Sequence, residues 1–85
     1  MIADAKAEFI RIEIKLGNTM LNIARTEQGR CDQERAIAAL QNARNALNSA
    51  KRFLPTLNDV AVETMDELLR GIEDLDRAIR EYETS

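Results

Sequence analysis

Apolar residues recur along this chain with the three- and four-residue spacing of amphipathic α-helices, in three long segments. The first segment carries two adjacent apolar stripes. One holds Phe9, Ile12, Leu16, Met20 and Ile23, and the other holds Ile10, Ile14, Gly17, Leu21 and Ala24. An ordinary surface helix shows an apolar stripe only somewhat wider than ~100°. Two adjacent stripes form a wider apolar face than one neighbouring helix can bury. They therefore predict a helix over residues 3–28 that contacts two other helices, or one helix and a partner chain.

The second segment repeats small and large apolar residues every seven positions. The repeating positions are Ala36, Ala43 and Ala50, then Leu40, Leu47 and Leu54, then Ala39, Ala46 and Phe53. This pattern predicts a helix over residues 32–53 whose alanines let a neighbouring backbone approach closely. The third segment has a single stripe, which predicts a helix over residues 57–82. Its members are Leu57, Ala61, Met65, Leu68, Ile72, Leu75, Ile79 and Tyr82.

Residues that favour turns and helix ends separate these segments. Gly29 suits the left-handed residue that ends a helix, and Asp32 suits the N-cap of the next one. Pro55 ends the second helix, and Thr56 with Asp59 fits a capping box for the third. Short connections between long helices make them antiparallel neighbours. We therefore predict one all-α domain over residues 1–85, an up-down-up antiparallel three-helix bundle.

Composition and charge narrow the partners. The chain has 85 residues, a net charge of −3, one cysteine and no histidine. A mildly acidic chain lacks the attraction for phosphate that supplies most nonspecific nucleic-acid binding, so we expect no nucleic-acid partner. No segment reaches the ~20 apolar residues that span a bilayer, and the first residues lack the features of a signal peptide. A lone cysteine fits a reducing compartment, and we expect a cytoplasmic protein that does not bind membranes.

The absence of histidine removes several kinds of chemistry. Histidine general acid–base catalysis, Ser-His and Cys-His nucleophile pairs and histidine metal sites all need that side chain. Cys31 follows Arg30 and precedes a helix N-terminus, a setting that is typical of reactive thiols. With no base to assist it, we interpret Cys31 as a residue of the corner between two helices. We predict no catalytic residue, no cofactor and no metal.

Glu13 falls inside the apolar arc of the first helix, between its two stripes. A buried carboxylate is costly without a partner. Folding the chain at its two corners brings Arg44 and Thr64 to about the level of Glu13. We therefore predict a buried polar layer of Glu13, Arg44 and Thr64. Such a layer fixes the register of the helices, or alternatively forms an anion or small-molecule site.

Three classes of function remain open at this point. The first is a non-enzymatic module that binds another protein or a second copy of itself as a two-fold homodimer. Its predicted interface is whichever of five residues the other helices leave uncovered: Ile2, Ile10, Ile14, Met20 and Leu21. The second is a small helical enzyme or ligand-binding bundle with a buried Glu13/Arg44 site. The third is an acidic adaptor or inhibitor that uses the carboxylates of the third helix to meet a basic partner.

A pattern of small and large residues over about residues 20–55 resembles a known helical hairpin. Its positions are Met20, Ile23, Ala24, Glu27, Cys31, Ala36, Leu40 and Ala43, with Pro55 ending the second helix. This spacing is similar to that of tetratricopeptide (TPR) hairpins and of the TPR-like microtubule-interacting-and-transport domains. The usual aromatic positions hold Met and Glu here, and Cys31 replaces a typical glycine. The resemblance implies a helix-binding groove and a partner protein.

Overall fold

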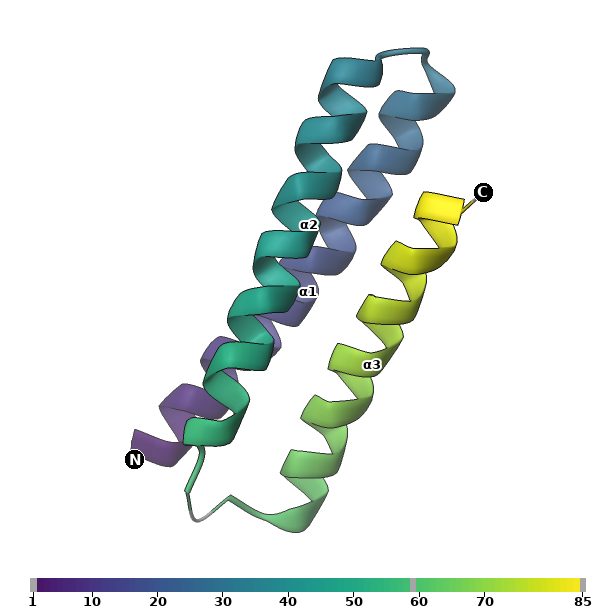
Figure 1. Cartoon of the computed structure of the whole chain (residues 1–85). Coiled ribbons are helices and arrows are strands. Elements are labelled where there is room, and N and C mark those ends of the chain that lie inside the picture. Colours follow the sequence, from purple (N-terminus) through teal and green to yellow (C-terminus); the bar gives the residue numbers. More distant parts are fainter. Residues whose placement is uncertain (1, 59, 85) are drawn as a thin grey trace.

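Three α-helices make up almost all of the chain in the computed structural model, which describes residues 2–58 and 60–84, with side chains from residue 5 onward. They are α1 (Ile2–Gly29), α2 (Gln33–Phe53) and α3 (Val62–Thr84), and a short 3₁₀ turn, η1 (Leu54–Thr56), follows α2. No strand occurs within those described ranges. The predicted all-α, three-helix fold is confirmed (Figure 1).

Side-chain contacts give the direction of each helix. Between α1 and α2, Phe9 contacts Phe53 and Met20 contacts Asn42, so residue numbers rise in one helix as they fall in the other. Between α1 and α3 they rise together, because Arg11 binds Glu67 and the Tyr82 hydroxyl donates to the Ala24 carbonyl. The helices therefore run up, down and up. Figure 1 shows that the α1–α2 hairpin extends past the C-terminal end of α3.

The corner between α1 and α2 is a Schellman turn centred on Cys31. The Cys31 N–H donates to the Gln28 carbonyl at 3.0 Å, and the Asp32 N–H donates to the Glu27 carbonyl at 2.9 Å. Cys31 takes the left-handed conformation, with φ of 63°, whereas no glycine has positive φ. The predicted left-handed Gly29 is therefore wrong, because α1 continues through Gly29 and the turn comes two residues later.

The start of α2 is as predicted. The Asp32 side chain accepts a hydrogen bond from the Arg35 N–H at 3.2 Å, which satisfies one of the donors left free at a helix N-terminus. The Asp32 carboxylate also pairs with the Arg35 side chain at 3.4 Å. The second helix ends at Phe53, two residues before Pro55, as the sequence predicts.

The third helix begins five residues later than predicted, at Val62 rather than residue 57. The Thr56 hydroxyl donates to the Phe53 carbonyl at 2.6 Å, so it closes η1 and does not cap α3. Asp59, the other predicted member of that capping box, lies outside the described residues. Leu57 is extended and buried at 8% exposure, because it joins the core cluster rather than starting a helix, and its N–H donates to the Leu54 carbonyl of η1 at 3.2 Å.

The core lies along the line where the three helices meet. Ile10, Leu21, Leu68 and Leu75 are the largest fully buried side chains, and α2 contributes mostly alanines: Ala36, Ala39, Ala43, Ala46 and Ala50. The molecule measures 46 × 19 × 15 Å, with a radius of gyration of 13.9 Å. A compact domain of this length has a radius near ~12 Å. The bundle is therefore elongated, and a large share of each helix faces solvent.

Glycines let α1 and α3 approach closely. A Cβ atom added to Gly17 would lie 2.4 Å from Cδ2 of Leu75, and one added to Gly71 would lie 2.9 Å from Cδ1 of Ile14. Each glycine thus receives a branched side chain from the facing helix.

No helix within the described part of the chain is long and apolar enough to cross a membrane.

Candidate functional site

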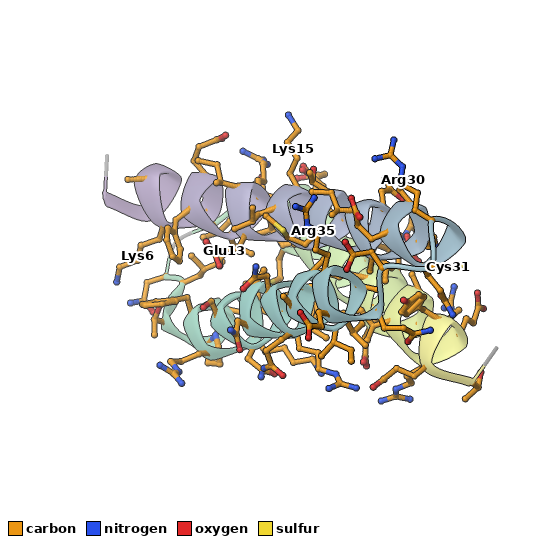
Figure 2. All side chains as sticks on the ribbon, turned by 90° about the horizontal axis from the view of Figure 1, so that it is seen from above. Lys6, Glu13, Lys15, Arg30, Cys31 and Arg35 are labelled. Carbon is orange, nitrogen blue, oxygen red and sulfur yellow. The ribbon has the colours of Figure 1, made fainter. Side chains whose placement is uncertain are left out.

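The predicted polar layer is not assembled. Glu13, Arg44 and Thr64 are all half-buried, and no charged or polar residue is buried within the described part of the chain. Glu13 makes no ion pair with any described residue, whereas Arg44 pairs with Glu83 of α3. The prediction of a Glu13–Arg44 pair is therefore wrong. Figure 2 shows Glu13 on the side of α1 that faces α2.

The register of the helices explains this error. The contacts Phe9–Phe53 and Met20–Asn42 place Ser49 level with Glu13 and carry Arg44 further along the bundle. Arg44 also lies on the side of α2 that faces α3, where it meets Glu83. The Arg11–Glu67 pair puts Thr64 more than one turn away from Glu13. The late start of α3 at Val62 accounts for that second displacement.

Cys31 is exposed at the tip of the α1–α2 hairpin (Figure 2). The backbone turn that it forms explains its position, since the residue occupies the left-handed place of the Schellman turn. No group of three His, Cys, Asp or Glu side chains within the described residues is arranged to hold a metal ion.

The predicted interface residues lie mostly in the core. Ile10 and Leu21 are 0% and 1% exposed, and Ile14 and Met20 are half-buried and pack against the core. The side chain of Ile2 lies outside the described residues. The surface that α2 and α3 leave uncovered therefore differs from the predicted interface. Ile10 and Leu21 are buried and are unavailable to a partner.

The uncovered face of α1 is the apolar stripe that contains Phe9, Ile12, Leu16 and Ile23. Phe9, Leu16 and Ile23 are each 40% exposed, and Ile12 is 55% exposed. Phe53 of α2, 39% exposed, extends this face, because its ring meets Phe9 edge-on with 5.1 Å between centroids. These five residues are called the outer stripe below. An aromatic pair of this edge-to-face geometry adds stability beyond the area that it buries.

A signal in the sequence distinguishes the two stripes. The inner stripe is the one formed by Ile10, Ile14, Gly17, Leu21 and Ala24. It contains the small residues Gly17 and Ala24, which permit a neighbouring helix to approach. The outer stripe contains only large residues at its repeating position, Phe9, Leu16 and Ile23, with charged residues beside them. Large residues with charged flanks are typical of a seam between separate helices. That difference would have assigned the outer stripe to the surface.

Ion pairs join α3 to the other two helices. The Arg11 guanidinium donates to both carboxylate oxygens of Glu67, at 2.8 and 3.2 Å. These hydrogen bonds raise the pKa of Arg11 and lower the pKa of Glu67. Lys51 of α2 lies 3.6 Å from Asp76. Part of the acidic surface of α3 is thus already bound to bases of α1 and α2.

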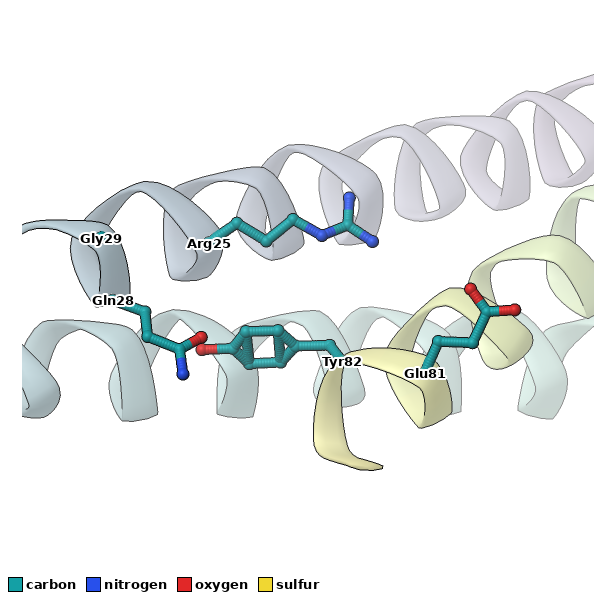
Figure 3. Close-up of a pocket in the computed structure, with 5 residues that line it drawn as sticks. All are labelled: Arg25, Gln28, Gly29, Glu81 and Tyr82. Atoms are coloured by element: carbon teal, nitrogen blue, oxygen red, sulfur yellow. The ribbon is translucent and has the colours of Figure 1, made fainter. Parts of the chain in front are cut away.

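Two shallow hollows lie between α1 and α3. The smaller, about 420 Å³, is at the C-terminal end of α3. Figure 3 shows Arg25 and Gln28 lining it from α1, and Glu81 and Tyr82 lining it from α3. The larger, about 510 Å³, lies between the middle of α1 and the first half of α3, where Arg11 and Glu67 bind each other. Both are open to solvent. In the larger one Arg11 pairs with Glu8 and Glu67, whereas Lys15 pairs with no described residue.

The fold and its surface define a class: an elongated three-helix domain whose longest helix carries an uncovered apolar stripe. Searches of protein-family models, of curated proteins and of solved structures found no match to the chain. The resemblance to TPR-like hairpins consequently stays a prediction.

Proposed function

We propose that this protein is a non-enzymatic interaction module that associates through the outer stripe of α1, either with another protein or with a second copy of itself. The observation that carries the proposal is the row of large apolar side chains that α2 and α3 leave 39–55% exposed. At roughly 200 Å² for a large side chain, five of them expose on the order of 400 Å². Contiguous apolar patches of about this size on monomers are often functional.

Other features of the chain support an interaction role over the alternatives. An enzyme needs several titratable groups that converge, and the Glu13–Arg44 pair expected to provide them does not form. An acidic adaptor would use the carboxylates of α3, and part of that acidic surface is already occupied, because Glu67, Asp76 and Glu83 are bound to bases of α1 and α2. A cytoplasmic location belongs to the same proposal and rests on the lone, exposed Cys31.

A pair of leucine substitutions tests the proposal. Leu16 lies in the outer stripe at 40% exposure, and Leu69 lies on α3 at 39%, so Leu16→Glu and Leu69→Glu remove equal hydrophobic exposure at different places. Both variants should keep the circular dichroism spectrum and stay within about 1 kcal/mol of the wild-type stability, because both side chains are partly exposed. We expect only Leu16→Glu to abolish association.

Association is measured in two ways. Sedimentation equilibrium reports whether the wild-type chain and each variant form dimers. Affinity capture from the native host, with identification of the recovered proteins, reports partners of the monomer. The proposal is overturned if the wild type stays monomeric and if wild type and Leu16→Glu recover the same proteins.

A further inference from the structure

The charged residues beside the outer stripe follow a seven-residue pattern. Phe9, Leu16 and Ile23 occupy one repeating position of α1, and Ile12, Thr19 and Thr26 occupy the position three residues later. On the side toward α2 the flanking row is Lys6, Glu13, Met20 and Glu27. On the side toward α3 it is Glu8, Lys15 and Asn22, which line the larger hollow. Such flanking rows set the partner and the orientation of paired helices.

Three charges of the α2-side row have no partner among the described residues. Lys6, Glu13 and Glu27 form no ion pair with any other residue that the structure describes. Lys6 and Glu27 stand at the two ends of this row, 21 positions apart, and they carry opposite charges. A row with a base at one end and an acid at the other complements itself when it is turned end to end.

We propose that α1 pairs antiparallel with α1 of a second copy, around a two-fold axis beside Leu16 and Thr19. This deepens the proposed function and rests on it. In this register Ile12 meets Ile23 of the second copy, and Leu16 meets Thr19. Lys6 of each copy then lies opposite Glu27 of the other, which makes two symmetric ion pairs. Glu13 lies opposite Met20, so like charges do not meet on this flank.

Two other arrangements of the same stripe bring like charges together. A parallel pair would place Glu8 of each copy opposite Glu13 of the other, because these flanking rows face each other when helices are parallel. An antiparallel pair shifted by seven residues would place Glu13 opposite Glu13 and Lys15 opposite Lys15. Like charges opposed across an interface select against that arrangement.

A shift by a further seven residues gives one rival register. It places Lys6 opposite Glu13 and Glu8 opposite Lys15, so its charges also agree. In that register, however, the overlap of the two helices stops near Thr19, which leaves Ile23 uncovered although it is 40% exposed in the single chain. Glu8 is also already bound to Arg11 at 3.1 Å. The register that pairs Lys6 with Glu27 covers the α1 part of the outer stripe from Phe9 to Ile23.

The size of the seam sets the strength of the pairing. The exposed apolar area of the outer stripe is about half of the ~800 Å² per partner that a standard protein interface buries. The polar flanking rows supply the rest, and rows of this kind add specificity more than affinity. We therefore expect a reversible dimer with a Kd on the order of micromolar.

Charge exchange tests the register, with the full chain studied under reducing conditions so that the exposed Cys31 stays free. Lys6→Glu or Glu27→Lys alone turns two attractive contacts per dimer into two repulsive ones, and we expect the Kd from sedimentation equilibrium to rise about tenfold. The double variant Lys6→Glu/Glu27→Lys should return to within about threefold of wild type, since it restores both pairs. Lys15→Glu makes the same charge change as Lys6→Glu but faces Asn22, so it should leave the Kd unchanged within threefold.

Each contrary result has a defined meaning. Rescue of Lys6→Glu by Glu13→Lys in place of Glu27→Lys, together with weakening by Lys15→Glu, would overturn this register in favour of the rival one. A dimer whose Kd ignores every charge exchange would show that α1 does not form the seam in this way. A wild-type chain that stays monomeric at millimolar concentration refutes the pairing with a second copy, whereas the broader interaction role is then decided by the comparison of Leu16→Glu with Leu69→Glu.

Discussion

The three glycines of this chain should respond in opposite ways to one substitution, Gly→Ala. In a helix, alanine is more favourable than glycine by about 0.5–1 kcal/mol, because glycine loses more backbone freedom on folding. At Gly29 a new Cβ would meet nothing within 4 Å, and φ is not positive, so no steric cost offsets the helical gain. We expect Gly29→Ala to stabilise the protein by about 0.5 kcal/mol, near the lower end because the site is the last residue of α1.

At Gly17 the new Cβ would lie 2.4 Å from Cδ2 of Leu75, more than 1 Å inside ordinary contact. Leu75 is 0% exposed, so its side chain cannot move out into solvent to make room. Overpacking of this kind costs about 1–3 kcal/mol, which exceeds the helical gain. We expect Gly17→Ala to destabilise the protein by about 1 kcal/mol.

Gly71 is the intermediate case. A Cβ there would lie 2.9 Å from Cδ1 of Ile14, which is half-buried and can move, so cost and gain should nearly cancel. Urea unfolding followed by circular dichroism, at one protein concentration because association contributes to apparent stability, gives the three free energies. For a domain of this size 1 kcal/mol corresponds to a Tm shift of about 4–8 °C. If Gly17→Ala proves as stable as Gly29→Ala, the close packing of α1 on α3 is refuted.

Two further outcomes test the corner and the α1–α3 ion pair. Cys31 has φ of 63°, so Cys31→Gly should unfold about 1 kcal/mol less easily than Cys31→Ala, which keeps the strained Cβ; equal urea midpoints for the two variants would rule out the left-handed turn. Because Arg11 lowers the pKa of Glu67 below its ordinary value of 4.5, the pair stabilises the fold above that pH and its contribution is lost as pH falls through the folded-state pKa. The free-energy difference between wild type and Glu67→Gln should therefore shrink between pH 7 and pH 3, and a difference that stays constant would contradict the pairing.

Sequence spacing was sufficient for the elements that depend on local patterns. The first two amphipathic segments and the Asp32 cap appear where they were predicted, because helical periodicity and capping act over a few residues, whereas α3 begins five residues later than predicted. The turn position was missed by two residues. Gly29 is the residue type that favours left-handed backbone, yet the chain places Cys31 there, and propensity cannot tell how far α1 continues.

The register of the helices against one another, and the choice of the buried face of α1, could not be derived from the pattern of a single helix. The predicted polar layer does not form, because placing Arg44 next to Glu13 requires the geometry of the corner to within a fraction of a helical turn. The contact of Phe9 with Phe53 sets a different register of α2 on α1. The prediction of the interface residues was wrong for a related reason. Both stripes of α1 are apolar, and burial depends on which one meets the small residues of the neighbouring helices.

The two faces of α1 differ in how they can be covered. The inner face meets α3 at van der Waals distance through Gly17, and the alanines of α2 let α2 pack closely on the same core. Alanine side chains are small and cover little apolar area. As a result, α2 and α3 together cover only one side of α1. The outer face has large side chains and unpaired flanking charges, which suit a helix that arrives from another molecule rather than one within the same short chain. That division within one helix is the physical basis of our proposal that the protein associates through α1.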